Sequence, residues 1–245
     1  MRAIILAAGV GRRLSPFTLS KPKCLLPVGG RSLLERMLES LDGAGSDEVL
    51  LVVGHCQEQI RERIGSRFGR LPVRYFQNPD YLKGSARSLW SCREDLRGDL
   101  LVMDADVLFP SEFLRRLIAA PSPSAFLLDR DFADTGEEMK LFVRGDRVVA
   151  IRKTVLPEAY DRVGEGVGFF KCAAVHAEPL RECVEETVTR EPEETEYEVA
   201  LDRLLRRVKV GYVDISGLPW TEIDFPEDLR RAEEEVLPSI GHVPA

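Results

Sequence analysis

Short apolar runs of strand-forming residues alternate with helical patterns through the first half of this chain. Such alternation is typical of a mostly parallel sheet with helices on both faces. Strands are expected at residues 2–7, 48–53, 73–76, 100–103 and 125–128. Helices are expected at 32–41, 58–64, 85–96 and 111–118, with Ser32, Ser85 and Ser111 as N-caps. The pattern therefore predicts a three-layer α/β/α unit with a doubly wound, Rossmann-like sheet.

The second half of the chain is less regular after the Pro121-Ser122-Pro123 segment. Apolar runs at residues 139–143 and 147–151 flank Gly145-Asp146, which predicts a β-hairpin. A further strand at 167–171 and two more helices follow. We expect this half to complete a mixed sheet and to add a small subregion beside it.

The chain shows no internal repeat, low-complexity tract or long linker. Its length of 245 residues suits one large α/β domain. We therefore expect a single domain at residues 1–236, divided into halves at 1–120 and 121–236, and a C-terminal tail at 237–245.

Composition excludes several classes of protein. No apolar run reaches the roughly 18 to 20 residues that cross a bilayer. Residues 4–8 are too few for a signal peptide, and Arg12-Arg13 follows them. The acidic balance, with a formal charge of −7, disfavours nucleic acid as a partner. The five cysteines form no CxxC pair, which indicates reduced thiols. We expect a cytoplasmic protein without a membrane span, and a homodimer remains open.

The first 34 residues hold six cations and neither Asp nor Glu, in contrast to the acidic chain as a whole. These cations are Arg2, Arg12, Arg13, Lys21, Lys23 and Arg31. A strand-like run leads directly into Gly9-Val10-Gly11, and glycines let backbone N–H groups approach a ligand closely. Cationic side chains beside such a loop predict a polyphosphate site. The alternative is a glycine-rich surface turn with incidental arginines.

Known phosphate-binding fingerprints do not account for this glycine loop. Gly9 and Gly11 are followed by Arg12, Arg13 and Leu14, so the third glycine of the dinucleotide motif G-x-G-x-x-G is missing. The chain also contains no G-x-x-x-x-G-K-[ST] sequence, which excludes a Walker P-loop. A different type of nucleotide site is therefore expected.

Two carboxylates, Asp104 and Asp106, follow the apolar run 100–103. Ligands of open α/β sheets bind beyond the carboxyl ends of the strands, so these acids are placed to hold a metal that bridges phosphates. Asp106 is the expected first ligand, and Asp104 is expected to support it. The alternative is that both acids cap the helix that begins near Ser111.

A second acidic segment, Glu222-Ile223-Asp224, lies late in the chain, before Phe225-Pro226. On physical grounds an Asp before a proline-initiated helix is more often a cap than a ligand. The histidines offer no alternative chemistry, because His55, His176 and His242 have no spaced acidic or serine partner that would suggest a triad.

The glycine loop and the basic residues after it resemble one family. The run Leu6-Ala7-Ala8-Gly9-x-Gly11-x-Arg13-Leu14, followed by Pro22-Lys23, resembles nucleotidyltransferases that join a nucleoside triphosphate to a phosphorylated sugar or alcohol. The resemblance implies the nucleotide-diphospho-sugar transferase fold, with nucleotide binding in residues 1–120 and acceptor binding in 121–236. It further implies nucleotide contacts from Leu6, Ala7, Ala8, Gly9 and Gly11. Arg13 would bind the β and γ phosphates, and Lys23 the α phosphate and the acceptor. Asp106 and Asp224 would bind a Mg²⁺ ion, with Glu222 as the nearby alternative to Asp224.

Further motifs resemble the cytidylyltransferase branch that acts on phosphocholine, inositol 1-phosphate and aminoethylphosphonate. Segments around Asn78 and around Gly84-Ser85 resemble its nucleobase and ribose contacts, which adds Asn78, Gly84, Ser85 and Asp104 to the expected nucleotide site. Arg12 stands where sugar-nucleotide pyrophosphorylases usually have Thr, and Asp104-Ala105-Asp106 stands in place of their Gly-Asp. These departures favour CTP as the nucleotide.

The same resemblance supplies candidate acceptor residues. These are Lys140, Lys153, Glu165 and Glu198. Each lysine has the alternative of a solvated strand-edge residue, and residues 191–198 could be an ordinary acidic helix start. A phosphocholine acceptor would suit an aromatic cage, for which the candidates are Tyr81, Phe169, Phe170, Tyr197 and Trp220.

The sequence thus predicts Mg²⁺-dependent transfer of a cytidylyl group from CTP to a small phosphorylated alcohol, with release of pyrophosphate. Three alternatives remain open. One is a sugar 1-phosphate nucleotidyltransferase, and another is a glycosyltransferase in which Asp104 and Asp106 form a D-x-D metal motif. The third is a catalytically silent nucleotide-binding module.

Overall fold

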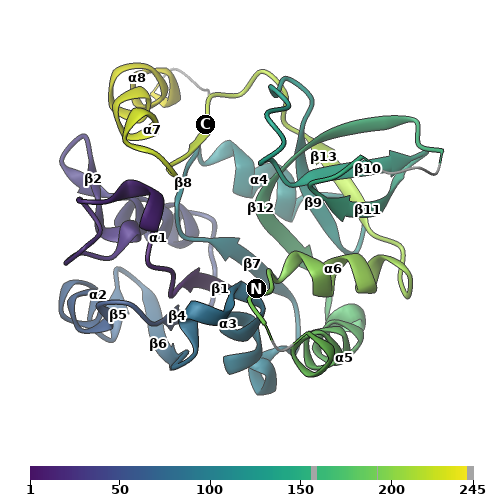
Figure 1. The fold of residues 1–245 in the computed structure, drawn as a ribbon, viewed down its shortest axis with the longest axis horizontal. Helices are drawn as coiled ribbons and strands as arrows, with labels where there is room; N and C mark the ends of the chain where they lie inside the picture. The colour runs from purple at the N-terminus through teal and green to yellow at the C-terminus, as the bar shows by residue number, and fades with distance from the viewer. Residues whose placement is uncertain (156–158, 192, 242–245) are drawn as a thin grey trace.

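The computed structural model describes residues 1–155, 159–191 and 193–241, and it contains a ten-stranded central sheet (Figure 1). In spatial order its main strands are β11 (Arg147–Arg152), β10 (Lys140–Arg144), β12 (Arg162–Cys172), β7 (Leu100–Asp104), β1 (Arg2–Ala7), β4 (Glu48–Val53), β6 (Leu71–Gln77) and β5 (Arg67–Phe68). Two others branch from it, β9 (Ala125–Asp129) beside β12 and β13 (Gly211–Asp214) beside β9.

Strand direction divides this sheet into two parts. β1 runs parallel to β4 and β7, and β4 runs parallel to β6. β12 lies antiparallel to β7, β9 and β10, and β10–β11 is the expected hairpin. The predicted doubly wound, mixed α/β fold is therefore confirmed.

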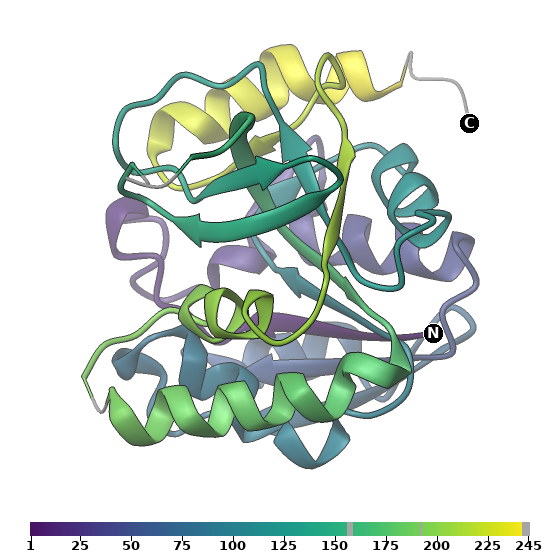
Figure 2. The same ribbon diagram turned by 90° about the vertical axis from the view of Figure 1, so that its right-hand side faces the viewer.

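Six helices cover the two faces of the sheet, as Figures 1 and 2 show. One face carries α1 (Leu33–Gly43), α2 (Gln57–Ile64) and α4 (Glu112–Ile118), and the other carries α3 (Ser85–Ser91), α5 (Ala174–Arg190) and α6 (Glu198–Leu205). Successive strand residues face opposite sides, so Ile5 packs with the first group and Ile4 with the second. Both isoleucines are fully buried, as expected for strands covered on both faces.

Of the three expected N-caps, Ser32 and Ser111 occupy that position and Ser85 does not. Ser32 caps α1 in a reciprocal arrangement, since its hydroxyl accepts the Glu35 N–H and Glu35 accepts the Ser32 N–H. Ser85 instead lies inside α3, and Gly84 occupies the N-cap position. Ser111 occupies the N-cap of α4 without making a side-chain cap hydrogen bond.

The helix predicted at residues 85–96 is also shorter than expected. It ends at Ser91, and a separate 3₁₀ turn, Arg93–Asp95, follows. The turn places the Asp95 carboxylate against the Arg74 guanidinium, with two hydrogen bonds of 3.0 and 3.1 Å between them. This bidentate pair joins the turn to β6, a contact that local helical periodicity could not reveal.

The C-terminal segment packs against the start of the chain. α7 (Pro226–Arg231), a π-helical turn (Ala232–Val236) and α8 (Leu237–Ile240) follow one another, and Ala232 and Val236 are buried in the same cluster as Leu14. Just before them, β14 (Thr221–Glu222) pairs antiparallel with β8 (Val107–Leu108). Residues 237–240 of the expected tail are thus helical, whereas 242–245 and His242 lie outside the described residues. The division into two halves stays a prediction.

In the described part of the chain, no helix is long and apolar enough to cross a membrane. All five cysteines are free thiols, and four of them are buried. Burial raises the pKa of Cys24 to about 12, so this thiol stays protonated at neutral pH. The expectation that most of the cysteines are buried is confirmed.

The capping difference gives a test of the fold. Ser32→Ala should lower the free energy of unfolding by about 1 kcal/mol, because the Glu35 N–H loses its acceptor. Ser111→Ala serves as the matched control and should change stability by less than about 0.5 kcal/mol, because no cap bond is lost. Urea denaturation measures both variants. Equal losses in the two would contradict the capping geometry.

Candidate active site

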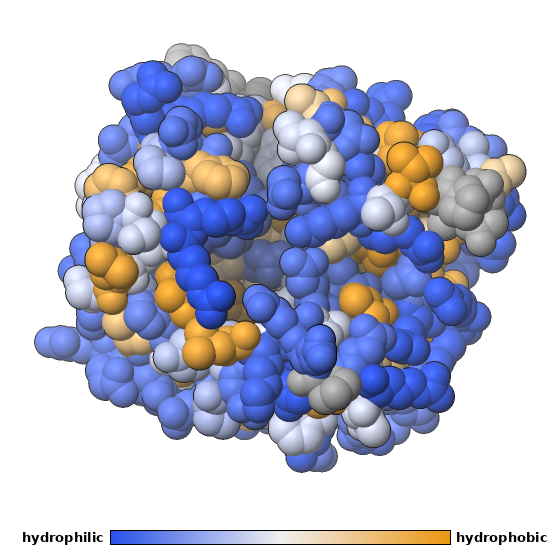
Figure 3. Space-filling view, in the orientation of Figure 1, coloured by the Kyte–Doolittle hydropathy of each residue, from blue (hydrophilic) through white to orange (hydrophobic). Residues whose placement is uncertain are grey.

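A cavity of about 1320 Å³ opens beside the carboxyl ends of β1 and β7. Figure 3 shows the hollow near the middle of one face, with mainly hydrophilic residues around it. Its walls come from the glycine loop, the segment between β9 and β10, the middle of β12, the start of α6 and β14. The lining includes these expected site residues: Leu6, Ala8, Gly9, Gly11, Arg13, Lys23, Gly84, Ser85, Asp104, Asp106, Lys153, Glu165, Glu198 and Asp224.

Three expected site residues lie behind the wall of this cavity. Ala7 packs into the core on the face that carries α1, because it follows Ile5 by two positions on β1. Asn78 is only 2% exposed and donates a 3.0 Å hydrogen bond to the Ser88 hydroxyl. Its side-chain oxygen accepts the Asp80 N–H at 2.9 Å. Asn78 therefore shapes the turn before α3 from within the protein.

Lys140 is the third residue behind the wall. It is 4% exposed, and its ammonium contacts the Asp134 carboxylate and the Lys153 carbonyl, each at 2.7 Å. Through these two contacts the Lys140 ammonium links the segment between β9 and β10 to the residue that follows β11. The solvated lysine considered in the sequence analysis is excluded for Lys140, and so is a free cation facing the cavity.

Lys23, Arg13 and two acids from distant parts of the chain meet at one point in the cavity. The Lys23 ammonium lies 2.7 Å from Asp106 Oδ2 and 2.6 Å from Asp224 Oδ1. The Arg13 guanidinium lies 2.6 Å from Asp224 Oδ2. Asp106 directly precedes β8 and Asp224 closely follows β14, so the pairing of these two strands brings the acids together.

Neither acid serves as a helix cap. At the start of α7 the Asp228 carboxylate accepts the backbone N–H groups of Asp224 and Phe225, at 2.9 and 2.7 Å. The side chain of Asp224 is left to face the cations. Asp106 likewise points to Lys23 and away from α4. The capping interpretation of both acids is wrong for this fold.

Three carboxylates form a group suited to a divalent cation. Oxygen atoms of Asp106, Glu222 and Asp224 lie within 4.8 Å of one another. Asp106 Oδ1 is buried without a hydrogen-bond partner among the described residues, which leaves an acceptor available to an ion. Hard cations such as Mg²⁺ prefer carboxylate oxygens. The chemistry of the group therefore fits a magnesium site.

Glu222 was expected only as an alternative to Asp224, whereas the structure places both acids beside Asp106. The sequence pattern that could have indicated Glu222 is its spacing of two residues from Asp224, because alternate residues of an extended segment face the same side. Ile223 between them is fully buried. Desolvation within the cavity wall, together with repulsion from Asp106 and Asp224, raises the pKa of Glu222 above its ordinary value. Such crowded negative charge is stabilised by a bound cation.

The charge on Lys23 is fixed by the same acids. Burial by itself would lower its pKa, but attraction to Asp106, Asp224 and Glu222 outweighs burial and raises the pKa above the ordinary value. The side chain is only 12% exposed. A permanently charged ammonium therefore lies inside the cavity.

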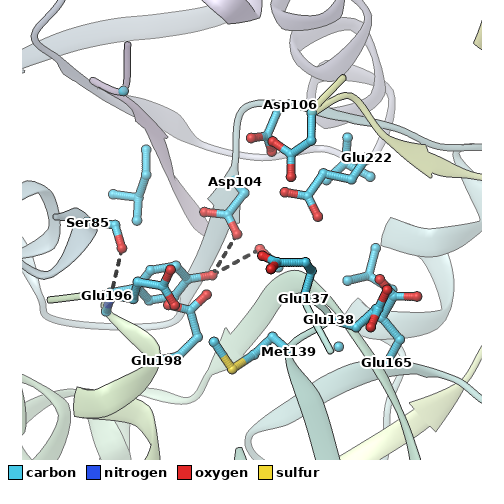
Figure 4. Close-up of a pocket in the computed structure, with 18 of the residues that line it drawn as sticks. Ser85, Asp104, Asp106, Glu137, Glu138, Met139, Glu165, Glu196, Glu198 and Glu222 are labelled. Atoms are coloured by element: carbon cyan, nitrogen blue, oxygen red, sulfur yellow. Dashed lines mark hydrogen bonds between the residues drawn. The ribbon is translucent and has the colours of Figure 1, made fainter. Parts of the chain in front are cut away.

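Asp104 occupies a different environment from Asp106. The Tyr197 hydroxyl donates to Asp104 at 3.0 Å, and Gly168 lies against the same carboxylate. A Cβ at Gly168, where φ is +70°, would come within 2.2 Å of Asp104 Oδ2. Burial, with repulsion from Glu198 and Asp106, raises the Asp104 pKa. Asp104 thus lies outside the three-acid group, near the start of α6 (Figure 4).

Gly84 lets two segments of another cavity wall pack closely together. The Thr195 N–H donates to the Lys83 carbonyl at 3.3 Å, and the Ala86 N–H donates to the Thr195 carbonyl at 3.0 Å. A Cβ at Gly84, where φ is +88°, would lie 2.2 Å from that carbonyl oxygen. The Ser85 hydroxyl adds a bond by accepting the Tyr197 N–H at 2.9 Å. These contacts hold the start of α6 against α3.

The far side of the cavity is acidic. The Trp220 indole N–H donates to Asp129 Oδ2 at 2.7 Å, whereas the Glu165 side chain makes no hydrogen bond or ion pair with the described residues. Burial, with repulsion from Glu138 and Asp129, raises the Glu165 pKa to about 7. Figure 4 shows Glu165 and Glu138 next to each other on this side. The Glu165 carboxylate is therefore unpaired on this wall, and attraction to Arg231 opposes part of the rise in its pKa.

The five aromatic residues considered for a cage all line the cavity, but Phe169 and Phe170 turn away from each other. Phe169 and Phe170 are neighbours on β12 and pack into opposite faces of the sheet. The Tyr197 hydroxyl is held by Asp104. Trp220 remains as the aromatic side chain beside the acidic wall.

Lys153 and Glu198 lie across the cavity from that wall. The Lys153 ammonium is 3.5 Å from Glu196, and burial raises the pKa of Glu198 above its ordinary value, with further repulsion from Glu196. Lys153 and Glu198 both line the cavity. Of the other two expected acceptor residues, Glu165 lines the opposite side and Lys140 does not line the cavity.

A family model described as the MobA-like NTP transferase domain matches residues 3–166, about two thirds of the chain. The chain belongs to this family. The match starts in β1 and ends within β12, so it includes the glycine loop, Lys23 and Asp106. This NTP transferase chain is therefore a member of a nucleotidyltransferase family, as its sequence motifs indicated.

Two curated relatives cover nearly all of this NTP transferase chain. One is "CMP-5'-(3-aminopropyl)phosphonate synthase" of Streptomyces rubellomurinus, which is 33% identical over 97% of the chain. The other is "Bifunctional IPC transferase and DIPP synthase" of Rubrobacter xylanophilus, which is 34% identical over 96%. The chain spans only 39% and 52% of the length of these relatives.

Solved structures share the fold. The inositol-1-phosphate CTP transferase of T. maritima aligns with 100% of the chain and 97% of its own, with a TM-score of 0.79 and 22% identity. The CTP:phosphocholine cytidylyltransferase of Streptococcus pneumoniae covers 95% of the chain and 97% of its own, with a TM-score of 0.74 and 25% identity. The expected nucleotide-diphospho-sugar transferase fold is confirmed.

The close approach at Gly84 gives a prediction for this wall. Gly84→Ala should lower the free energy of unfolding by more than about 2 kcal/mol, because a positive φ and a clash with the Thr195 backbone both oppose a side chain. Gly217→Ala is the matched control, since its φ is +82° and no atom lies within 4 Å of the added Cβ. Thermal and urea unfolding would show whether the two variants differ. Identical losses would contradict the close packing of Gly84 on Thr195.

Proposed function

We propose that this protein transfers a cytidylyl group from CTP to a small phosphorylated or phosphonylated acceptor and releases pyrophosphate, with Mg²⁺ as cofactor. The observation that carries the proposal is the meeting of Arg13, Lys23, Asp106 and Asp224 beside the glycine loop. The names of the Streptomyces relative and of the streptococcal enzyme support CTP as the nucleotide.

The charges in the cavity suit an in-line reaction between anions. An acceptor oxygen would attack the α-phosphorus of CTP, and pyrophosphate would leave on the opposite side. Its attacking oxygen is already anionic at neutral pH, so no general base is required. Accordingly, neither histidine nor cysteine is found among the described residues that line the cavity.

The cations would neutralise the phosphates directly, and the acids would do so indirectly by holding a Mg²⁺ ion. Lys23 would contact the α phosphate and the incoming acceptor, and Arg13, which is 47% exposed, would reach the β and γ phosphates. A Mg²⁺ ion held by Asp106 and Asp224, with Glu222 beside them, would supply further charge neutralisation. Backbone groups at Gly9 and Gly11 would let the nucleotide approach the loop closely.

The alternatives receive less support. A D-x-D glycosyltransferase would use Asp104 and Asp106 together, but Tyr197 holds Asp104 outside the three-acid group. A silent module does not account for two cations and three acids grouped in one cavity. A sugar 1-phosphate nucleotidyltransferase keeps specific support, because a UTP–glucose-1-phosphate uridylyltransferase of Haloferax volcanii is 27% identical over 96% of both chains.

We further propose that the acceptor carries a cationic group at the end opposite its phosphate or phosphonate. The acidic wall of Asp129, Glu138 and Glu165 includes one carboxylate without a partner in the described structure, and Trp220 lies beside it. An ammonium placed there would pair with Glu165 and contact an aromatic face. This arrangement favours an aminoalkylphosphonate or phosphocholine over inositol 1-phosphate or a hexose 1-phosphate.

A substrate matrix tests the proposed reaction. CTP and UTP are each paired with 2-aminoethylphosphonate, phosphocholine, inositol 1-phosphate and glucose 1-phosphate, and released pyrophosphate is measured. We expect turnover with CTP and at least one of the two cationic acceptors. Preferred turnover of UTP with glucose 1-phosphate would instead establish the sugar-nucleotide alternative.

Paired variants tie that turnover to the cavity. Lys23→Ala should lower kcat by about 100-fold, because a preorganised charge at the reacting phosphate is lost. Lys21→Ala, which removes an exposed cation from the same loop, should leave kcat within about twofold. Circular dichroism would verify that both variants are folded. Full activity of Lys23→Ala would exclude the proposed role.

The pKa of Glu165 predicts a pH dependence of acceptor binding. Because this pKa is about 7, the carboxyl is mostly neutral at pH 6 and mostly charged at pH 8, so the KM for a cationic acceptor should fall as the pH rises. Glu165→Gln should raise that KM about 10-fold at pH 8 and remove the Glu165-dependent part of the profile. Initial rates with inositol 1-phosphate provide the control. A profile that Glu165→Gln leaves unchanged would contradict the assignment.

A further inference from the structure

Two cations of the cavity are bound to the acids proposed to hold the metal. Lys23 Nζ contacts both Asp106 and Asp224, and Arg13 takes the second oxygen of Asp224. Both carboxylate oxygens of Asp224 are therefore engaged by positive charge. In the proposed function Arg13 and Lys23 bind phosphates. The two cations thus have two alternative kinds of partner, the acids and the phosphates.

We propose that Lys23 is the internal counter-ion of the metal site: in the free protein its ammonium holds Asp106 and Asp224 together, and it must leave them before a divalent ion binds. The inference rests on the proposed function, because the triphosphate is the second partner that draws Lys23 away. Metal and nucleotide then bind cooperatively, and the free protein has a low affinity for the metal alone.

The position of the ammonium supports this exchange. The ammonium lies between the two acids, with Nζ 2.7 Å from Asp106 Oδ2 and 2.6 Å from Asp224 Oδ1. Its charge would strongly repel a divalent ion bound by the same carboxylates, because solvation is restricted there. The unpartnered Oδ1 of Asp106 remains available to receive an ion. Ion and ammonium therefore compete for the acids.

The side chain of Lys23 can leave without a change of fold. Its aliphatic part runs along Gly11, where an added Cβ would lie 3.2 and 3.3 Å from Lys23 Cβ and Cδ. The glycine loop thereby guides the stem of the side chain, while the terminal bonds remain free to rotate. The Gly9 and Gly11 loop lines the same cavity, so a triphosphate bound there offers the ammonium new anionic partners.

Reciprocity makes the proposal measurable. A nucleotide that withdraws Lys23 from the acids must raise the affinity for the metal, and the metal must raise the affinity for the nucleotide by the same factor. Removing the ammonium by mutation should have the first effect without nucleotide. An ordinary phosphate-binding lysine predicts no gain in metal affinity when it is removed.

Binding of Mn²⁺ to the full chain, followed by the electron paramagnetic resonance signal of the free ion, tests the proposal. Without nucleotide, Lys23→Gln should bind Mn²⁺ about 10-fold more tightly than the wild type, a factor common for coupled sites. Lys23→Arg keeps the competing charge and should bind as weakly as the wild type. A non-hydrolysable CTP analogue should tighten Mn²⁺ binding in the wild type much more than in Lys23→Gln.

The outcomes separate this proposal from the proposed function. Mn²⁺ affinity of Lys23→Gln equal to or below that of the wild type would overturn the counter-ion role, and CTP turnover by the wild type would still stand. Tighter Mn²⁺ binding in a protein that does not turn over CTP would support the counter-ion role and refute the reaction. If Lys23→Gln fails to fold, Lys23→Met is measured in its place with the same expectations.

Discussion

The antiparallel pairing of β8 with β14 is the contact on which the site depends. It joins a segment that leaves the central sheet at Asp106 to one that precedes the last helices, and so places Asp224 beside Lys23. The ion pairs formed there are partly buried, since Lys23 is 12% and both aspartates are 22% exposed. Removing one member of such a group leaves the others uncompensated, so the cluster and the fold stabilise each other.

Charge is distributed unevenly around the cavity. Arg13 and Lys23, which follow the glycine loop, contact the acids. The opposite wall carries Glu165 and its acidic neighbours. The proposed nucleotide and the proposed acceptor would share one space of about 1320 Å³. The small glycines at positions 84 and 168 permit the close packing that shapes these walls.

Local patterns predicted most of the parallel half of the sheet. The limits of β1 and β4 agree with the prediction, because buried apolar runs between turn residues depend little on distant contacts. The extent of the helix after Gly84 was wrong, since Asp95 is held by Arg74 through a tertiary ion pair. Ser85 was wrong as an N-cap for the same type of reason, because its hydroxyl binds the backbone of Tyr197.

By itself the sequence determined the family, the alternating fold and the chemical types of the site residues, because glycines, cations and acids near strand ends are local signals. Only the tertiary structure decided which acids meet. It separated Asp104 from Asp106, joined Glu222 to Asp224 and Asp106, and withdrew Asn78 and Lys140 behind the cavity wall. These outcomes depend on strand pairing and on hydrogen bonds between residues far apart in the chain, which no local spacing encodes.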